Sequence, residues 1–225
     1  MVEASSPPAL ASTPQHHSAL AHHFDDLTQQ REAAELGMWV FLVTEFMFFG
    51  GLFLAYLAYR GWYPREFAAG SATMDVALGT INTAVLLTSS LTMALAVQAA
   101  QAAQRLTLIW LLLATIGLGV IFLGIKAFEY HHKYEHHLIP FAGFPFQYGG
   151  ADAAGMMTFF NLYFLMTGMH AVHMIIGIGI LLALVVFAWR GGLLAERSVI
   201  VHNTGLYWHF VDLVWVYLFP FFYLL

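Results

Sequence analysis

Five long apolar stretches alternate with polar connections along the 225 residues of the chain. They cover residues 37–59, 76–97, 106–125, 157–189 and 199–223. A helix needs about 20 apolar residues to cross the hydrocarbon core of a bilayer, and each stretch is long enough. Backbone polar groups in lipid must be paired internally, and these runs do not alternate with a period of two, which favours helices over a barrel. The pattern therefore predicts an all-α integral membrane protein, a bundle of five transmembrane helices.

The polar segments are short, with two exceptions. Residues 1–36 are rich in Ala, Ser, Pro, Gln and His, and they lack the basic start and apolar stretch of a secretory signal. We expect a polar N-terminal tail there, followed by one five-helix domain at 37–225. The second exception is 126–152, where two prolines and a Gly-Gly pair predict a loop between the third and fourth spans.

Composition supports the membrane assignment and excludes several kinds of site. The chain is 60% hydrophobic and only 9% charged, whereas soluble domains carry about 25% charged residues. It has no cysteine, which excludes disulfides, thiolate metal ligands and cysteine nucleophiles. The formal net charge of −5 provides no basic patch, so we expect no nucleic-acid partner. Lysines and arginines divide equally between the two sides of the predicted bundle, so charge counting does not fix its orientation.

Five acidic or histidine residues lie well inside the apolar stretches, away from their ends. Glu45 lies in the first span, His170 and His173 in the fourth, and His209 and Asp212 in the last. At 1.5 Å per residue, the first three occupy similar layers of the membrane, and the other two lie close to that depth. Such residues usually face the bundle interior or a partner. We therefore predict a hydrogen bond between Glu45 and a histidine of the fourth span. The alternative is a set of satisfied interior groups that only fix helix register.

The segment EYHHKYEHH, residues 129–137, raises the question of a metal site. His132 and His136 have the spacing of one histidine box of the membrane di-iron desaturases. Such enzymes gather several boxes on one face, and the His170–His173 pair is predicted to be separated from this segment by most of the membrane thickness. The favoured interpretation is a solvated end of the third helix.

In that interpretation Lys126, Glu129 and Lys133 form a surface charge ladder, because they are spaced by three and four residues along a helix. The neighbouring histidines then decorate the same wet surface, with adventitious metal binding as their chemistry.

Several stretches together resemble one family. GMWVFLVTEFMFFGGLF, INTAVLLTSSLTMALA, GIKAFEY, TFFNLYFLMTGMHAVHMIIGIGIL and YWHFVDLVWVYLFPFFYLL are similar to helices of subunit III of the haem–copper respiratory oxidases. The likeness covers nearly all of residues 36–225 and corresponds to the five-span bacterial form, which lacks the first two of the seven spans of longer members.

The resemblance implies a non-redox accessory subunit of a proton-translocating terminal (cytochrome c) oxidase, packed against subunits I and II. It implies no cofactor in this chain, haem and copper in the partner subunits, bound phospholipid, and a role in proton uptake and stable turnover during aerobic electron transport. A larger respiratory supercomplex is a further candidate partner. The implied location is the bacterial inner membrane, with the N-terminus cytoplasmic. The residues carried over for lipid or proton support are Glu45, His170, His173, Trp208, His209 and Asp212.

Three functions stay open at this point. Beside the oxidase subunit stand a subunit-III-like protein that accompanies a nitric oxide reductase and, more remotely, an independent desaturase-like enzyme. The electron donor of the complex, cytochrome c or a quinol, depends on other subunits and is left open.

Overall fold

The computed structural model describes residues 24, 26–139, 153–191 and 198–224. Its long helices are α1 (Leu27–Trp62), α3 (Val76–Gln101), α4 (Arg105–Glu135), α5 (Ala153–Trp189) and α6 (Ser198–Phe219). A short helix α2 (Pro64–Ala72) joins α1 to α3, and a π-helical turn η2 (Pro220–Leu224) extends α6. All five long helices are long and apolar enough to cross a membrane, which confirms the predicted fold class.

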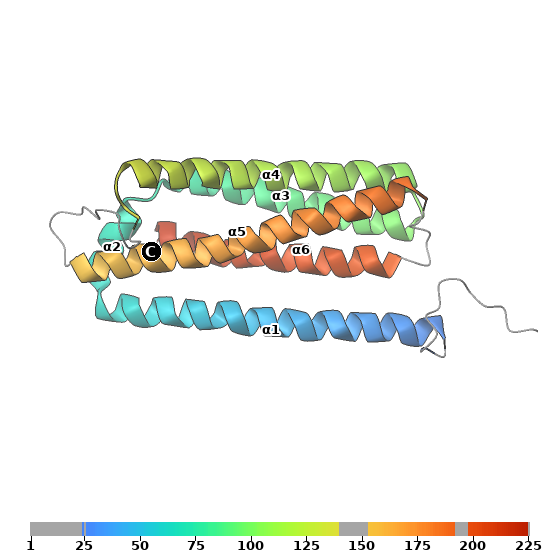
Figure 1. Cartoon of the computed structure of the whole chain (residues 1–225), viewed down its shortest axis with the longest axis horizontal. Coiled ribbons are helices and arrows are strands. Elements are labelled where there is room, and N and C mark those ends of the chain that lie inside the picture. Colours follow the sequence, from blue (N-terminus) through green and yellow to red (C-terminus); the bar gives the residue numbers. More distant parts are fainter. Residues whose placement is uncertain (1–23, 25, 140–152, 192–197, 225) are drawn as a thin grey trace, which may run out of the picture.

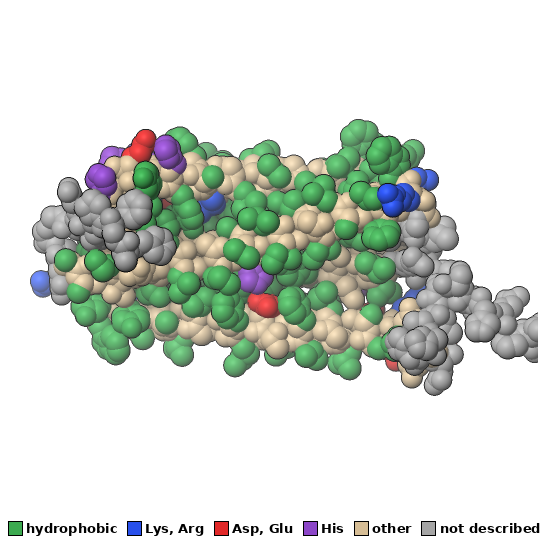
Figure 2. Space-filling model, in the orientation of Figure 1, with side chains coloured by type: hydrophobic (Ala, Val, Ile, Leu, Met, Phe, Trp, Pro, Cys, Tyr) green, Lys and Arg blue, Asp and Glu red, His purple; other side chains and the backbone are tan. Residues whose placement is uncertain are grey.

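The long helices run side by side and alternate in direction (Figure 1). Helices α3 and α4 pack along one side, α5 and α6 lie in the middle, and α1 lies outermost against α5 and α6. Helix α1 is the least enclosed span, with 17% of its most apolar window buried, against 50% for α6. A large part of α1 is therefore left for lipid or a partner. Figure 2 shows apolar side chains along the bundle and charged side chains gathered toward its two ends.

Several helix boundaries extend beyond the predicted spans; α3, for example, ends at Gln101 rather than at residue 97. Helix α1 begins at Leu27, ten residues ahead of the predicted span, and Asp26 caps it by accepting a 2.7 Å hydrogen bond from the Gln29 amide. Residues 27–36, assigned to the tail, are therefore helical. Helix α5 begins at Ala153 rather than near residue 157. Of the rest of the predicted tail, only Phe24 and Asp26 belong to the described residues.

Helix α4 continues ten residues past its predicted span and ends in a Schellman motif. The Leu138 amide donates to the Lys133 carbonyl, and the His137 amide donates to the Tyr134 carbonyl. His137 has a φ of 54°, the left-handed conformation that this motif requires. The predicted loop from 126 to 152 is therefore helical over its first ten residues, and residues 140–152 lie outside the described part.

Helix α2 was missed, although Pro64 at its first turn is a common helix-start signal. It lies against α5 through a close approach at Gly70, where a Cβ would come within 2.4 Å of the Phe159 ring. Any larger residue there would separate α2 from α5. Helix α2 thus closes one end of the bundle.

Candidate functional site

An acidic and a histidine side chain meet near the middle of the bundle surface in Figure 2. Glu45 of α1 and His173 of α5 form such a pair, with 3.1 Å between Glu45 Oε2 and His173 Nε2. Their side chains are 20% and 13% exposed, so the pair opens partly to the outside of the bundle. The predicted hydrogen bond between Glu45 and a histidine of the fourth span is confirmed.

The surroundings of this pair determine how many protons it holds. His173 Nδ1 lies 2.8 Å from the Met169 carbonyl, an acceptor, so Nδ1 carries a hydrogen. A proton shared in the contact to Glu45 would reside either on the carboxyl group or on Nε2. Both forms are neutral as a unit, which suits a low-dielectric site where a lone charge would be costly. Tyr207 fixes the backbone beside the pair by donating to the His173 carbonyl at 3.0 Å.

His170 has a different environment although it lies only three residues away. It is 1% exposed and packs edge-on against the Phe122 ring, at 5.4 Å between centroids, and beside Trp215 at 5.5 Å. Within the described residues neither of its ring nitrogens has a hydrogen-bond partner. The sequence grouped His170 with His173, but the structure turns one into the core and the other toward α1.

His209 and Asp212 lie on the side of α6 that faces α3. His209 Nδ1 is 2.7 Å from the Ser90 hydroxyl. Ser90 also lies near the Asp212 carboxyl group, although within the described residues both carboxyl oxygens lack a hydrogen bond. Asp212 is 3% exposed. A carboxylate in that position would be an unpaired buried charge, so the neutral acid is the form that fits.

Trp208 is part of the packing. It is fully buried, and its indole N–H donates to Ser89 at 3.0 Å. Its ring fits between two glycines, because a Cβ on either Gly119 or Gly177 would come within 3.0 Å of it. The structure therefore gives Trp208 a role in holding α4, α5 and α6 together.

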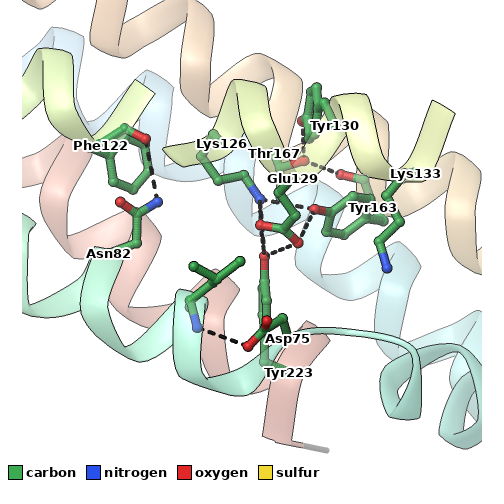
Figure 3. A network of polar contacts seen from close by, with 12 residues as sticks. Asp75, Asn82, Phe122, Lys126, Glu129, Tyr130, Lys133, Tyr163, Thr167 and Tyr223 are labelled. Atoms are coloured by element: carbon green, nitrogen blue, oxygen red, sulfur yellow. Dashed lines mark hydrogen bonds and ion pairs between the residues drawn. The ribbon is translucent and has the colours of Figure 1, made fainter. Parts of the chain in front are cut away.

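A second polar site was misread from the sequence. Lys126, Glu129 and Lys133 are 4%, 5% and 4% exposed, so the predicted solvated charge ladder is wrong. Lys126 Nζ donates three hydrogen bonds, to Glu129 at 3.0 Å, Tyr163 at 2.9 Å and Tyr223 at 3.0 Å (Figure 3). Three bonds use all the protons of an ammonium group.

The same two tyrosines also donate hydrogen bonds to the Glu129 carboxylate, which completes a closed network. Tyr163 donates to Glu129 at 2.7 Å, and Tyr223 donates at 2.6 Å (Figure 3). The Lys126 ammonium also lies over aromatic rings, including that of Trp215 at 5.1 Å. This lysine–glutamate centre joins α4, α5 and the C-terminal turn η2, and it is closed on itself.

The histidines of the same segment are exposed, as expected. His132 and His136 stack on each other with 4.4 Å between ring centroids, and His131 pairs with Glu135 at 3.3 Å on the surface. Among the described residues no three His, Cys, Asp or Glu side chains are grouped to hold a metal ion. The described residues therefore offer no ligand set for a desaturase-like di-iron site.

Comparison with known proteins places this arrangement in a family. The family model described as cytochrome c oxidase subunit III matches residues 18–225. The chain belongs to the cytochrome c oxidase subunit III family. The resemblance predicted from the helix motifs is therefore confirmed, and the protein is a subunit III of the haem–copper oxidase family.

The similar curated proteins carry names that refer to quinol. A probable quinol oxidase subunit 3 of Staphylococcus epidermidis is 30% identical over 202 residues, which cover 88% of this chain and 92% of the relative. Proteins of the same name from Staphylococcus haemolyticus and Staphylococcus aureus are 28% and 29% identical over 198 residues, covering 87% of this chain and 90% of each relative. The family and the five spans together indicate a multi-pass membrane subunit that associates with other oxidase subunits.

Proposed function

We propose that this chain is the non-redox accessory subunit of a proton-translocating terminal oxidase, packed on subunit I beside subunit II. The observation that carries the proposal is the Glu45–His173 pair, a carboxyl group and an imidazole whose facing atoms lie 3.1 Å apart within two membrane-spanning helices and can share a proton. Because the pair is partly exposed, a partner subunit or lipid packed on α1 and α5 would contact it directly.

Redox chemistry is assigned to the partner subunits. Copper centres require clustered histidine, cysteine or carboxylate ligands; among the described residues no three such side chains are grouped, and the whole chain has no cysteine. This chain's own contribution is to hold a proton and to stabilise the complex during turnover.

The electron donor is a separate question. The oxidase resemblance suggests cytochrome c, whereas the relatives named above are probable quinol oxidase subunits. Quinol is therefore the donor to test first, with cytochrome c as the competing choice. Oxygen consumption by the purified complex with each reduced donor separates them.

Bound phospholipid is part of the proposal. An apolar groove of about 370 Å³ lies between α1 and α6, and six aromatic side chains line most of it, namely Phe46, Phe49, Phe53, Phe210, Tyr217 and Phe221. Its shape and lining suit an acyl chain. Retention of labelled lipid by the complex tests this directly.

The proposed location is the bacterial inner membrane, with the N-terminus cytoplasmic. Five spans carry the two ends of the chain to opposite sides, and in Figure 1 the start of α1 and the C-terminal turn lie toward opposite ends of the bundle. Reporter fusions at both termini test the direction, and active cytoplasmic reporters at the C-terminus alone would reverse it.

The central experiment replaces Glu45 with Gln in the complete complex. We expect unchanged assembly and haem content, together with slower proton uptake and earlier loss of activity, since Gln cannot exchange the proton that the pair shares. Glu35→Gln is the matched control, because Glu35 is exposed near the start of the same helix. Wild-type turnover and durability in Glu45→Gln would leave the pair only a structural role.

Co-purification from native membranes distinguishes the competing functions. A haem- and copper-containing complex that reduces oxygen supports the oxidase subunit, whereas a complex that reduces nitric oxide supports the reductase-associated protein. Iron retained by the isolated chain without a haem partner would contradict both.

A further inference from the structure

A polar groove of about 460 Å³ lies where the end of α4 meets the start of α3. It is lined by Thr73, Met74, Asp75, Leu78, Phe128, Glu129, His132 and Lys133. Pockets of roughly 300–1,000 Å³ are typical for small ligands. The groove adjoins the lysine–glutamate centre, because Glu129 contributes to both.

The groove lies at the level where the apolar surface ends. Helix α3 carries no charge from Val76 to Gln101, and α4 carries none between Arg105 and Lys126. Asp75 stands just before the first of these runs, and the groove residues of α4 follow the second. Phe128, 64% exposed at the edge of the groove, continues the lipid-facing surface. A ligand there would meet both the headgroup region and the hydrocarbon.

The lining combines charges of both signs. Asp75 Oδ1 accepts a hydrogen bond from the Leu78 amide at 3.0 Å. The Asp75 carboxylate shows no other hydrogen bond within the described residues. Lys133 donates to the Thr73 carbonyl at 2.8 Å, which accounts for one of its three protons. The carboxylates of Asp75 and Glu129 both act on the Lys133 ammonium. His132 is exposed at the rim and can donate a hydrogen bond.

The presence of both an acidic and a basic side chain in the groove indicates which kind of headgroup it can bind. An anionic headgroup would meet the Asp75 carboxylate, and a simple cation would meet Lys133, so each would suffer repulsion. A zwitterionic headgroup satisfies both signs, with its ammonium near Asp75 and its phosphate near Lys133 and His132. The exposed Phe128 ring offers a surface for the first segment of an acyl chain.

We propose that this groove binds one phospholipid with an aminoethyl phosphate headgroup, through Asp75, Lys133 and His132. The site is separate from the apolar groove between α1 and α6. The inference rests on the lipid-binding part of the proposed function, and it adds the headgroup class and the residues that recognise it.

The test uses the purified, delipidated complex in mild detergent. Phosphatidylethanolamine or phosphatidylglycerol is added back, and the lipids retained per complex are counted by native mass spectrometry. We expect the wild type to retain one more phosphatidylethanolamine than Asp75→Asn, with an affinity about fivefold lower in the variant. Asparagine still caps a helix, so α3 should remain intact. Glu135→Gln, an exposed carboxylate on the same end of α4, is the control and should retain the lipid.

His132→Gln is the second variant, because His132 is exposed and its replacement should not affect folding. It should also weaken retention. Equal retention of phosphatidylethanolamine by wild type, Asp75→Asn and His132→Gln would overturn the site, as would stronger binding of phosphatidylglycerol by the wild type. Full displacement of the lipid by millimolar inorganic phosphate would show a site for free anions instead. The haem spectrum of each preparation reports on the subunit role separately, so a failed lipid test with an intact spectrum discards only this site.

Discussion

Removal of the carboxylate from the lysine–glutamate centre should be among the most destabilising single changes in the chain. In Glu129→Gln, Lys126 keeps its charge in a position only 4% exposed and loses its counter-ion. Breaking a buried pair in this way costs about 3–5 kcal/mol of the free energy of unfolding. For a chain of this size, that corresponds to a fall of roughly 6–20 °C in the apparent unfolding temperature.

The double variant Lys126→Met with Glu129→Gln tests the cause. Methionine fills the aromatic surroundings of the ammonium, and glutamine still accepts hydrogen bonds from Tyr163 and Tyr223. We expect a total loss of about 1–3 kcal/mol, smaller than that of Glu129→Gln alone. Thermal unfolding of the complex, followed by tryptophan fluorescence, measures all variants. Glu135→Gln serves as control and should change stability by less than about 0.5 kcal/mol, because its pair with His131 is exposed. A double variant as unstable as the sum of the two single variants would refute the reasoning, since the two groups would then act independently.

Three further predictions concern packing and the exposed histidines. Gly70→Ala should lower stability by about 1–3 kcal/mol because its Cβ would meet the Phe159 ring, whereas Gly117→Ala, with open space around its Cβ, should be neutral or slightly stabilising; thermal unfolding of both variants decides. Tyr223→Phe should cost about 1–3 kcal/mol because Glu129 and Lys126 each lose a partner, and an unchanged unfolding temperature would contradict the closed network seen in Figure 3. His132→Ala should leave the metal content of the complex unchanged, as measured by elemental analysis, and a loss of bound metal would restore the ligand hypothesis.

Hydropathy was sufficient to predict the spans but not the helix ends. The thickness of the hydrocarbon core requires about 20 apolar residues per span, and each apolar run shows this length directly in the sequence. A helix that continues into the polar region, as α4 does to Glu135, carries no such signal. Its end depends on a Schellman motif with a non-glycine residue, His137, in the left-handed conformation.

The two polar sites differ in how far the sequence could reveal them. Glu45 and His173 could be paired from depth alone, because each is ionisable and lies inside an apolar run. For Lys126 and Glu129, a spacing of three is the same in a solvated ladder and in a buried ion pair. The residues that decide between these cases, Tyr163 and Tyr223, lie 34 to 97 positions away along the chain. The available signal was Lys126 directly after an uncharged span, which is a position where a charge needs a partner.

The contrast between these two sites also separates stability from function. In the lysine–glutamate centre every proton of Lys126 is used within the chain, so a partner subunit has nothing there to exchange with. The Glu45–His173 pair is partly exposed and joins α5 to α1, the least enclosed helix. A residue that only holds the fold is best closed off, whereas a proton donor must remain accessible to what it serves. On this argument the centre near the end of α4 maintains the subunit, and the pair between α1 and α5 is the site that we propose acts on the complex.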